Sequence, residues 1–178
     1  MDLEKLKYPI GKFDCPSKIT SEILKAWISI LEHFPNRLNN LIRDLTESQL
    51  NTPYRLDGWT VHQVVNHLYD SHHNSYTRFK WALTEDVPLI KVYNEKAWAD
   101  LFDSKNAPIE LSLNAITALH AKWVFLLKGL PFEGFQKEFI HPDGNEKLTL
   151  SENTGIYAWH CNHHYAHIEN LIKKEGWQ

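Results

Sequence analysis

The stretch that decides the fold lies near the end of the chain, where residues 149–176 read TLSENTGIYAWHCNHHYAHIENLIKKEG. Thr149 and Glu152 have the spacing of a helix-capping box, and Gly176 is a residue that commonly ends helices. Between them, residues recur at steps of three and four, as on one face of an α-helix. This stripe consists of Leu150, Thr154, Tyr157, Cys161, Tyr165, Ile168 and Ile172. The stretch therefore predicts one long amphipathic helix.

Three earlier segments show the same helical period. The first begins at Thr20, and the second begins at a capping box formed by Thr60 and Gln63. The third covers residues 109–129 and ends at a glycine followed closely by proline. Four amphipathic helices of this length predict an all-α protein built as a four-helix bundle.

The connections between these helices carry weaker signals. The 84–108 segment is long enough for a crossover, and a short helix is expected over 94–102. Asp143-Gly144 lies between apolar flanks and predicts a small hairpin before the last helix. Pro35 removes a backbone donor inside the first helix, so we expect a kink or a break there. Residues 1–18 have no sustained period and predict an irregular arm.

Length and composition predict a single globular domain over residues 1–178, with 43% hydrophobic and 23% charged residues. The formal net charge of −3 gives no electrostatic footprint for nucleic acid. Neither a signal-peptide core nor an apolar run of about 18 residues is present, so we expect a cytoplasmic protein without a membrane partner. Cys15 and Cys161 are too far apart for a disulfide framework, and Cys161 is interpreted as a small core residue.

Histidines are concentrated in the last predicted helix. Four of the 11 fall within eight residues, and His160/His164 and His163/His167 are both spaced i,i+4. Side chains at this spacing lie above one another on one helix face, so two imidazoles can bind one metal ion. A third ligand must then come from another part of the fold.

Helical phase distinguishes the two pairs. Taking Cys161 as the centre of the apolar stripe, His164 lies about 60° and His160 about 100° away, whereas His167 and His163 lie about 120° and 160° away. His160 and His164 are therefore the pair predicted to turn inward. For the third ligand, the second helix offers His72 at the centre of its stripe and His67 on its flank, and phase alone leaves both open. The solitary histidines are interpreted as ordinary surface or core residues: His33, His120 and His141.

Two motifs extend this interpretation by resemblance. Residues 59–68, WTVHQVVNHL, resemble the W-T-x-x-x-V-x-x-H-L helix start of the DinB/YfiT-like metalloprotein superfamily. Residues 160–164, HCNHH, are similar to its second motif, H-x-x-H-H. The similarity includes Tyr8-Pro9-Ile10-Gly11 and Thr52-Pro53-Tyr54-Arg55 and extends over essentially the whole chain. Within the superfamily, the chain most resembles the YfiT-type metal-dependent hydrolases.

The resemblance implies a four-helix bundle in up-down-down-up order, a cytoplasmic homodimer and one divalent metal ion per subunit. Its ligands, carried over by position, are His67, His160 and His164. His163 matches a family position that is not a direct ligand. His163 and His72 are therefore candidates for lining the pocket or surrounding the ligands. Asp70 lies about one helical turn after His67 and is a further candidate, with a capping or salt-bridge role as the favoured alternative.

Three neutral imidazoles leave at least one coordination position open, as in catalytic zinc sites. That position can hold water or ionise a thiol. Zinc is the first choice of metal and nickel the alternative, because histidine ligands discriminate poorly between them. No His-Glu-x-x-His motif supplies a general base, so no catalytic residue beyond the ligands is predicted.

Three functions are compatible with this site. The first is hydrolysis of a small substrate by metal-activated water. The second is transfer of a low-molecular-weight thiol to an electrophile, as in bacillithiol transferase-like members of the superfamily. The third is a metal-binding stress protein without turnover. The sequence does not identify the substrate.

Overall fold

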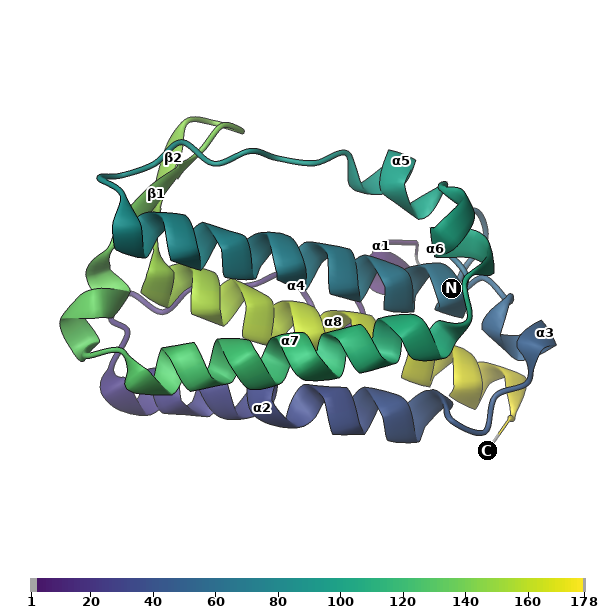
Figure 1. Ribbon diagram of the computed structural model, residues 1–178. Helices are drawn as coiled ribbons and strands as arrows, with labels where there is room; N and C mark the ends of the chain where they lie inside the picture. The colour runs from purple at the N-terminus through teal and green to yellow at the C-terminus, as the bar shows by residue number, and fades with distance from the viewer. Residues whose placement is uncertain (1–2, 178) are drawn as a thin grey trace.

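The computed structural model describes residues 3–177 and has the predicted architecture. Four long helices form a bundle, and a two-stranded hairpin precedes the last of them (Figure 1). The bundle helices are α2 (Ser21–Ile42), α4 (Val61–Thr84), α7 (Ile109–Gly129) and α8 (Leu150–Glu175). The all-α four-helix prediction is therefore confirmed.

The helices run in up-down-down-up order. In Figure 1, α2 and α8 run from left to right, while α4 and α7 run from right to left. Helix α2 packs against α7 and α8, and α4 packs against the same two helices. The antiparallel pair α4 and α8 carries the histidine motifs, so the topology brings these motifs onto neighbouring helices.

Side-chain caps begin the helices where the sequence indicates. Thr60 and Gln63 form a complete capping box at α4, and Thr149 and Glu152 form another at α8. Helix α8 ends at Gly176, whose φ of 67° lies in the left-handed region that glycine adopts without strain. A third capping box starts the short α3 (Glu47–Leu50).

A long crossover joins the parallel helices α4 and α7 and contains two short helices. They are α5 (Glu95–Ala99) and α6 (Phe102–Asn106), in place of the one expected over 94–102. Asn94 caps α5, and the chain turns at Asp100 before α6 begins.

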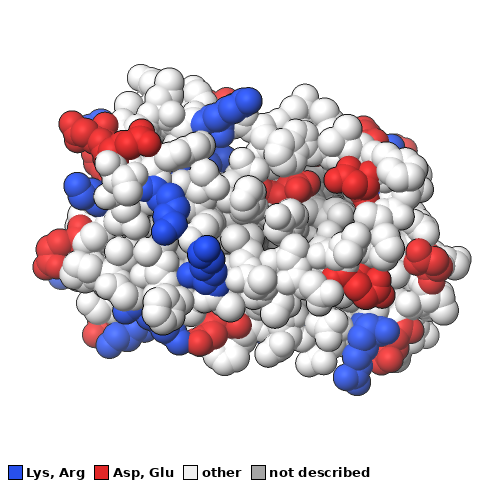
Figure 2. Space-filling model, viewed as in Figure 1, with Lys and Arg blue, Asp and Glu red and all other residues white. Residues whose placement is uncertain are grey.

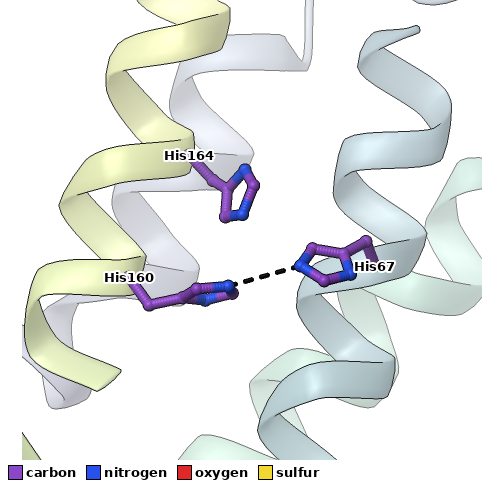
Figure 3. Close-up of side chains that lie close together, drawn as sticks. All are labelled: His67, His160 and His164. Atoms are coloured by element: carbon purple, nitrogen blue, oxygen red, sulfur yellow. Dashed lines mark hydrogen bonds between the residues drawn. The ribbon is translucent and has the colours of Figure 1, made fainter. Parts of the chain in front are cut away.

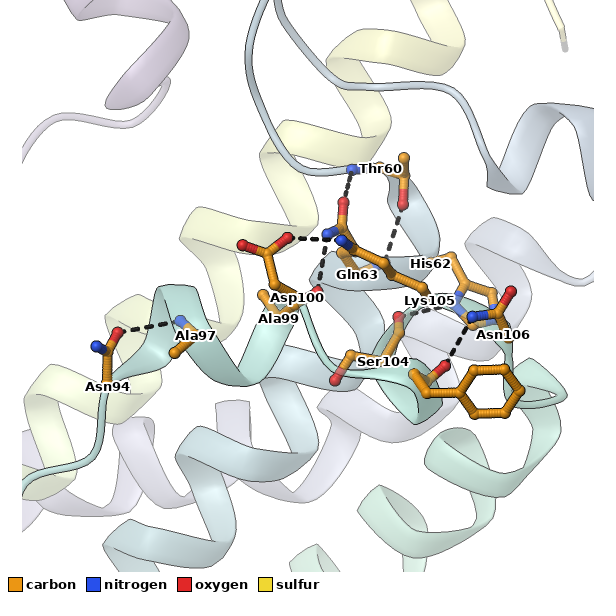
Figure 4. A network of polar contacts seen from close by, with 11 residues as sticks. Thr60, His62, Gln63, Asn94, Ala97, Ala99, Asp100, Ser104, Lys105 and Asn106 are labelled. Atoms are coloured by element: carbon orange, nitrogen blue, oxygen red, sulfur yellow. Dashed lines mark hydrogen bonds and ion pairs between the residues drawn. The ribbon is translucent and has the colours of Figure 1, made fainter.

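The crossover is tied to the start of α4 by side-chain hydrogen bonds (Figure 4). Gln63 donates from Nε2 to the Ala99 carbonyl oxygen at 2.8 Å. The ring nitrogens of His62 face the carbonyl oxygens of Ser104 and Ala107 at 3.1 and 2.7 Å. These contacts position the crossover beside the face of α4 that carries His67.

The predicted hairpin is present, with β1 (Glu138–His141) antiparallel to β2 (Glu146–Thr149). A short 3-10 helix, η1 (Phe132–Gln136), leads into it from α7. Ile140 donates its backbone N–H to the Pro88 carbonyl oxygen at 2.9 Å, so the hairpin also holds the start of the crossover.

Two further expectations were wrong in part: the break at Pro35 and the wholly irregular N-terminal arm. Helix α2 is continuous through the buried Pro35, without a break, because packing on both neighbours offsets the missing backbone hydrogen bond. The N-terminal arm is not wholly irregular, since it contains the short helix α1 (Leu3–Lys7).

The surface carries mixed charge. Lysine and arginine are interspersed with aspartate and glutamate among the described residues on the face in Figure 2, and no broad field of one sign covers it. Within residues 3–177, none of the helices combines the length and apolar character needed to cross a membrane.

Candidate metal centre

Three imidazoles converge between α4 and α8. His67 lies on α4, and His160 and His164 lie one turn apart on α8 (Figure 3). One ring nitrogen from each lies within 4.8 Å of the others. His67 and His164 are only 5% and 7% exposed, whereas His160 is partly exposed, so solvent reaches the cluster mainly at His160.

The spacing of two of these nitrogens suits a tetrahedral metal site. His67 Nε2 and His160 Nε2 lie 3.3 Å apart. Two zinc–nitrogen bonds of about 2.05 Å at a tetrahedral angle place their nitrogens roughly 3.3 Å apart. Without a metal, a proton on one of these two nitrogens forms a hydrogen bond to the other. A divalent cation can take the place of that proton and bind both nitrogens.

Hydrogen bonds that cross the whole bundle set the tautomer of His160. His120 Nδ1 donates to the Leu31 carbonyl oxygen at 2.6 Å, since a carbonyl can only accept. In neutral His120, Nε2 must then accept, and it does so from His72 Nδ1 at 2.7 Å. His72 Nε2 in turn accepts from His160 Nδ1 at 3.0 Å. His160 Nε2 therefore carries a lone pair, and this lone pair faces the cluster.

We call these four residues the histidine hydrogen-bond chain: Leu31 on α2, His120 on α7, His72 on α4 and His160 on α8. Its first acceptor is available because of Pro35. A residue at position 35 would normally donate its N–H to the carbonyl four residues earlier, which is that of Leu31, but proline has no N–H. Pro35, where a kink or a break of α2 was expected, thus leaves the Leu31 carbonyl oxygen free to accept a hydrogen bond from His120.

A second, shorter path orients His164. His167 donates from Nε2 to the Lys7 carbonyl oxygen at 3.0 Å, so its Nδ1 can only accept. His164 Nδ1 lies 3.4 Å from that atom and donates to it, which leaves His164 Nε2 without a proton. The N-terminal arm thus helps to set the tautomer of a residue on α8.

The crossover supplies the partner of His67. The Tyr93 hydroxyl lies 3.4 Å from His67 Nδ1, and a hydroxyl can donate or accept. His67 Nδ1 therefore has a partner in either tautomer, including the one that frees Nε2 for a metal. The Trp59 ring packs on the His67 ring with centroids 4.7 Å apart and restricts its orientation.

Burial keeps these histidines neutral. Loss of solvation lowers the pKa of His67 to about 4, and it is the main reason that the pKa values of His160 and His164 lie well below the ordinary value. At neutral pH all three imidazoles have a lone pair to offer. Each neutral imidazole carries a single proton, so His67 has only to hold its proton on Nδ1 instead of Nε2 when a cation binds.

A cleft of about 570 Å³ borders the cluster. His160 and Tyr157 line it from α8, Ser71 from α4, and Tyr93 from the crossover. A volume of this size accommodates a small organic molecule next to one of the three imidazoles.

The other site predictions have mixed outcomes. His72 contacts His160 through a ring nitrogen. His163 packs against the His164 ring, with centroids 4.9 Å apart. Asp70 is half-buried on α4, and no hydrogen bond or ion pair joins its carboxylate to another described residue. Cys161 is buried, as predicted for a core residue.

The interpretation of His120 as a core residue is confirmed, but the surroundings of His120, His163 and His167 were not predicted. His120 is not an isolated side chain, because it is 1% exposed and hydrogen-bonded to His72. His163 and His167 do not face solvent, although helical phase turns them away from the core stripe. The N-terminal arm covers them, with the Tyr8 ring 5.9 Å from that of His163.

The chain is similar to known proteins over nearly its whole length. Residues 30–168 match the DinB superfamily. A Bacillus cereus (strain AH820) protein named as a "Putative metal-dependent hydrolase" is 50% identical over 175 residues, which span 98% of this chain and 100% of the relative. "Putative metal-dependent hydrolase YfiT" from Bacillus subtilis (strain 168) is 48% identical over 172 residues, which span 97% of each chain.

A solved structure shows the same fold. The structure of YfiT from Bacillus subtilis aligns with a TM-score of 0.96 at 47% sequence identity, covering 98% of this chain and 99% of that chain. That protein is described as "a probable metal-dependent hydrolase with an unusual four-helix bundle topology".

Proposed function

This chain belongs to the DinB superfamily, and from that premise we propose that it is a metal-dependent hydrolase of a small substrate. The proposed ligands of one divalent metal ion are His67, His160 and His164. The observation that carries the proposal is the convergence of these three neutral imidazoles beside an open cleft. The names of its relatives agree with this activity.

Zinc is the proposed metal, with nickel as the alternative. Three imidazoles and no carboxylate suit either ion, and the spacing of His67 Nε2 and His160 Nε2 suits tetrahedral zinc. When bound, such an ion supplies a Lewis acid that polarises a carbonyl and makes water acidic near neutral pH.

The protein's own groups would hold and orient this site. His72 and His167 keep the Nδ1 protons of His160 and His164 in place, so that each Nε2 is available. Tyr157 and Tyr93 bring hydroxyl groups to the cleft wall beside His160. Substrate entering this cleft would therefore meet polar groups next to the reactive position.

Assays on zinc-loaded protein test the proposal. Esters, amides, and electrophiles with and without an added low-molecular-weight thiol are the substrates. We expect hydrolysis of an ester or amide without thiol, with loss of turnover in His160→Ala and no change in His33→Ala, whose side chain is exposed on α2. Turnover only with thiol would favour a thiol transferase, and none in any assay would favour a non-catalytic metal-binding protein.

A homodimer in the cytoplasm stays a prediction from the resemblance. Sedimentation equilibrium of the purified protein tests the first part, and fractionation of the source cells tests the second.

A further inference from the structure

A buried cation without a counter-ion lies in the same cleft. Arg78 on α4 is only 8% exposed, and its Nε is buried without a hydrogen-bond partner. Among residues 3–177, no hydrogen bond or ion pair reaches any other nitrogen of this guanidinium. These other nitrogens are not among the buried unpartnered atoms, so they reach the solvent of the cleft and are free to bind a ligand there. A binding site for an anion would explain why an unpaired arginine side chain lies at this position.

The position of Arg78 links it to the metal-ligand cluster. Arg78 lines the cleft of about 570 Å³ together with Asn153, Tyr157 and His160. Asn153 donates to Ser75 at 2.9 Å, so α4 and α8 stay in contact along the floor between Arg78 and His160. One continuous cavity thus joins the guanidinium to a proposed ligand.

Helix geometry sets the distance between Arg78 and His67 along α4. Arg78 follows His67 by 11 residues, which is about three turns, so both lie within about 20° of one another around α4. Their backbones are separated by roughly 16 Å along the helix axis. Because side chains on a helix lean toward its N-terminus, the guanidinium is brought toward His67.

The remaining charges of the cleft are at its rim. Glu95, Asp143 and Glu146 line it, and all three are exposed to solvent. Lys96 is also exposed, so solvent screens its charge. The buried Arg78 is therefore the group that distinguishes an anion from a neutral ligand inside the cleft.

We propose that Arg78 binds an anionic group, a carboxylate or a phosphate, at the end of the substrate remote from the reacting bond. This inference rests on the proposed function, since it places the reacting bond at the three histidines. The substrate class is then a small, elongated molecule with one negatively charged end. Guanidinium groups bind both kinds of anion in bidentate geometry.

Linear hydroxamic acids test the proposal, because the hydroxamate binds zinc and the far end can be varied. A series of chain lengths ending in carboxylate, phosphonate or primary amide is titrated into zinc-loaded protein by calorimetry. At the best length, we expect one anionic form to bind at least about tenfold more tightly than the amide. The better of the two anions identifies the natural group.

Variants assign the preference to Arg78. In Arg78→Met, the anionic form should bind no more tightly than the amide, and the affinity for the amide should be unchanged. Arg78→Lys should keep part of the preference for the anionic form. Lys96→Met, which removes an exposed cation from the same cleft, should have little effect. The melting temperature of Arg78→Met should not fall, because Arg78 makes no hydrogen bond or ion pair with a described residue that the substitution would break.

Equal affinity of wild-type protein for the anionic and neutral forms would overturn the proposal, as would an anion preference that survives in Arg78→Met. Neither outcome depends on turnover. Failure of the ester and amide assays would reject the hydrolase while leaving the anion preference measurable.

Discussion

His120 lies 2.6 Å from the Leu31 carbonyl oxygen and 2.7 Å from His72, and this placement determines which nitrogen of His160 is free. Replacing the ring by phenylalanine keeps an aromatic side chain but removes both hydrogen bonds. We expect His120→Phe to weaken zinc binding about 10- to 100-fold, the usual effect of losing a group that orients a ligand. Competition with a chromophoric chelator measures this affinity.

A matched pair of variants separates orientation from packing. His120→Gln can still donate to Leu31 and accept from His72, so it should retain most of the affinity that His120→Phe loses. His33→Ala should not change it. Zinc affinity of His120→Phe equal to that of the wild type would show that the histidine hydrogen-bond chain does not support the ligands.

At the residue level, the sequence predicted which three histidines lie close together, and their binding of a metal stays a prediction. The i,i+4 spacing brings His160 and His164 together, and the resemblance supplies His67. The part played by His120 could not be predicted, because its partners come from α2 and α4 and are distant in sequence. The burial of His163 was missed for the same reason, since the arm that covers it is about 150 residues away.

At the scale of helices, Gly155 fixes how closely α8 approaches α2. A Cβ added there would lie 2.7 Å from Trp27 Cη2 and 2.8 Å from Phe13 Cζ. Gly155→Ala should therefore lower the free energy of unfolding by about 1–3 kcal/mol through overpacking, although alanine alone favours helix. Urea denaturation measures this change.

Gly129→Ala is the control for helix propensity. Nothing lies within 4 Å of a Cβ added at Gly129, at the end of α7. The free energy of unfolding should stay equal or rise by up to about 1 kcal/mol. If Gly155→Ala stabilised the protein to the same extent as Gly129→Ala, the close contact of α8 with α2 would be wrong.

Helix boundaries were predictable because caps are local. Thr60 with Gln63 and Thr149 with Glu152 form the expected boxes, and Gly176 ends α8. The effect of Pro35 was not predictable, since a helix tolerates proline only when tertiary contacts offset the loss. Those contacts are made by residues far away in sequence.

At the scale of the whole molecule, buried histidines make the stability of the metal-free protein depend on pH. Burial lowers the pKa of His67 and of His120 to about 4. Below about pH 6.5 the unfolded chain binds protons that the folded chain excludes, so stability is lost as pH falls toward 4. Urea unfolding should show a decrease of at least about 2 kcal/mol between about pH 7.5 and pH 5.

Asp70 acts in the opposite direction. Burial and then the charge of Asp103 raise the pKa of Asp70 to about 6, so its contribution is present at low pH and is lost as pH rises through 6. One half-exposed carboxyl cannot outweigh several buried imidazoles. Constant or rising stability on acidification would therefore contradict the neutral, buried state of the histidines.

The overall bundle was predictable from periodicity, but the direction of its helices came from the resemblance. A long connection permits a crossover without requiring one, and the structure shows that 85–108 joins two parallel helices (Figure 1). This topology places α4 beside α8 and brings the Tyr93 hydroxyl beside His67. No feature of the sequence predicted that Tyr93 would lie beside His67.

The identity of the three ligands is the central claim, and metal content tests it most directly. Each protein is loaded with zinc, desalted and measured by elemental analysis. We predict about one equivalent in the wild type and in His163→Ala, and almost none in His67→Ala, His160→Ala or His164→Ala. A full equivalent retained by His67→Ala, or lost from His163→Ala, would contradict the assignment.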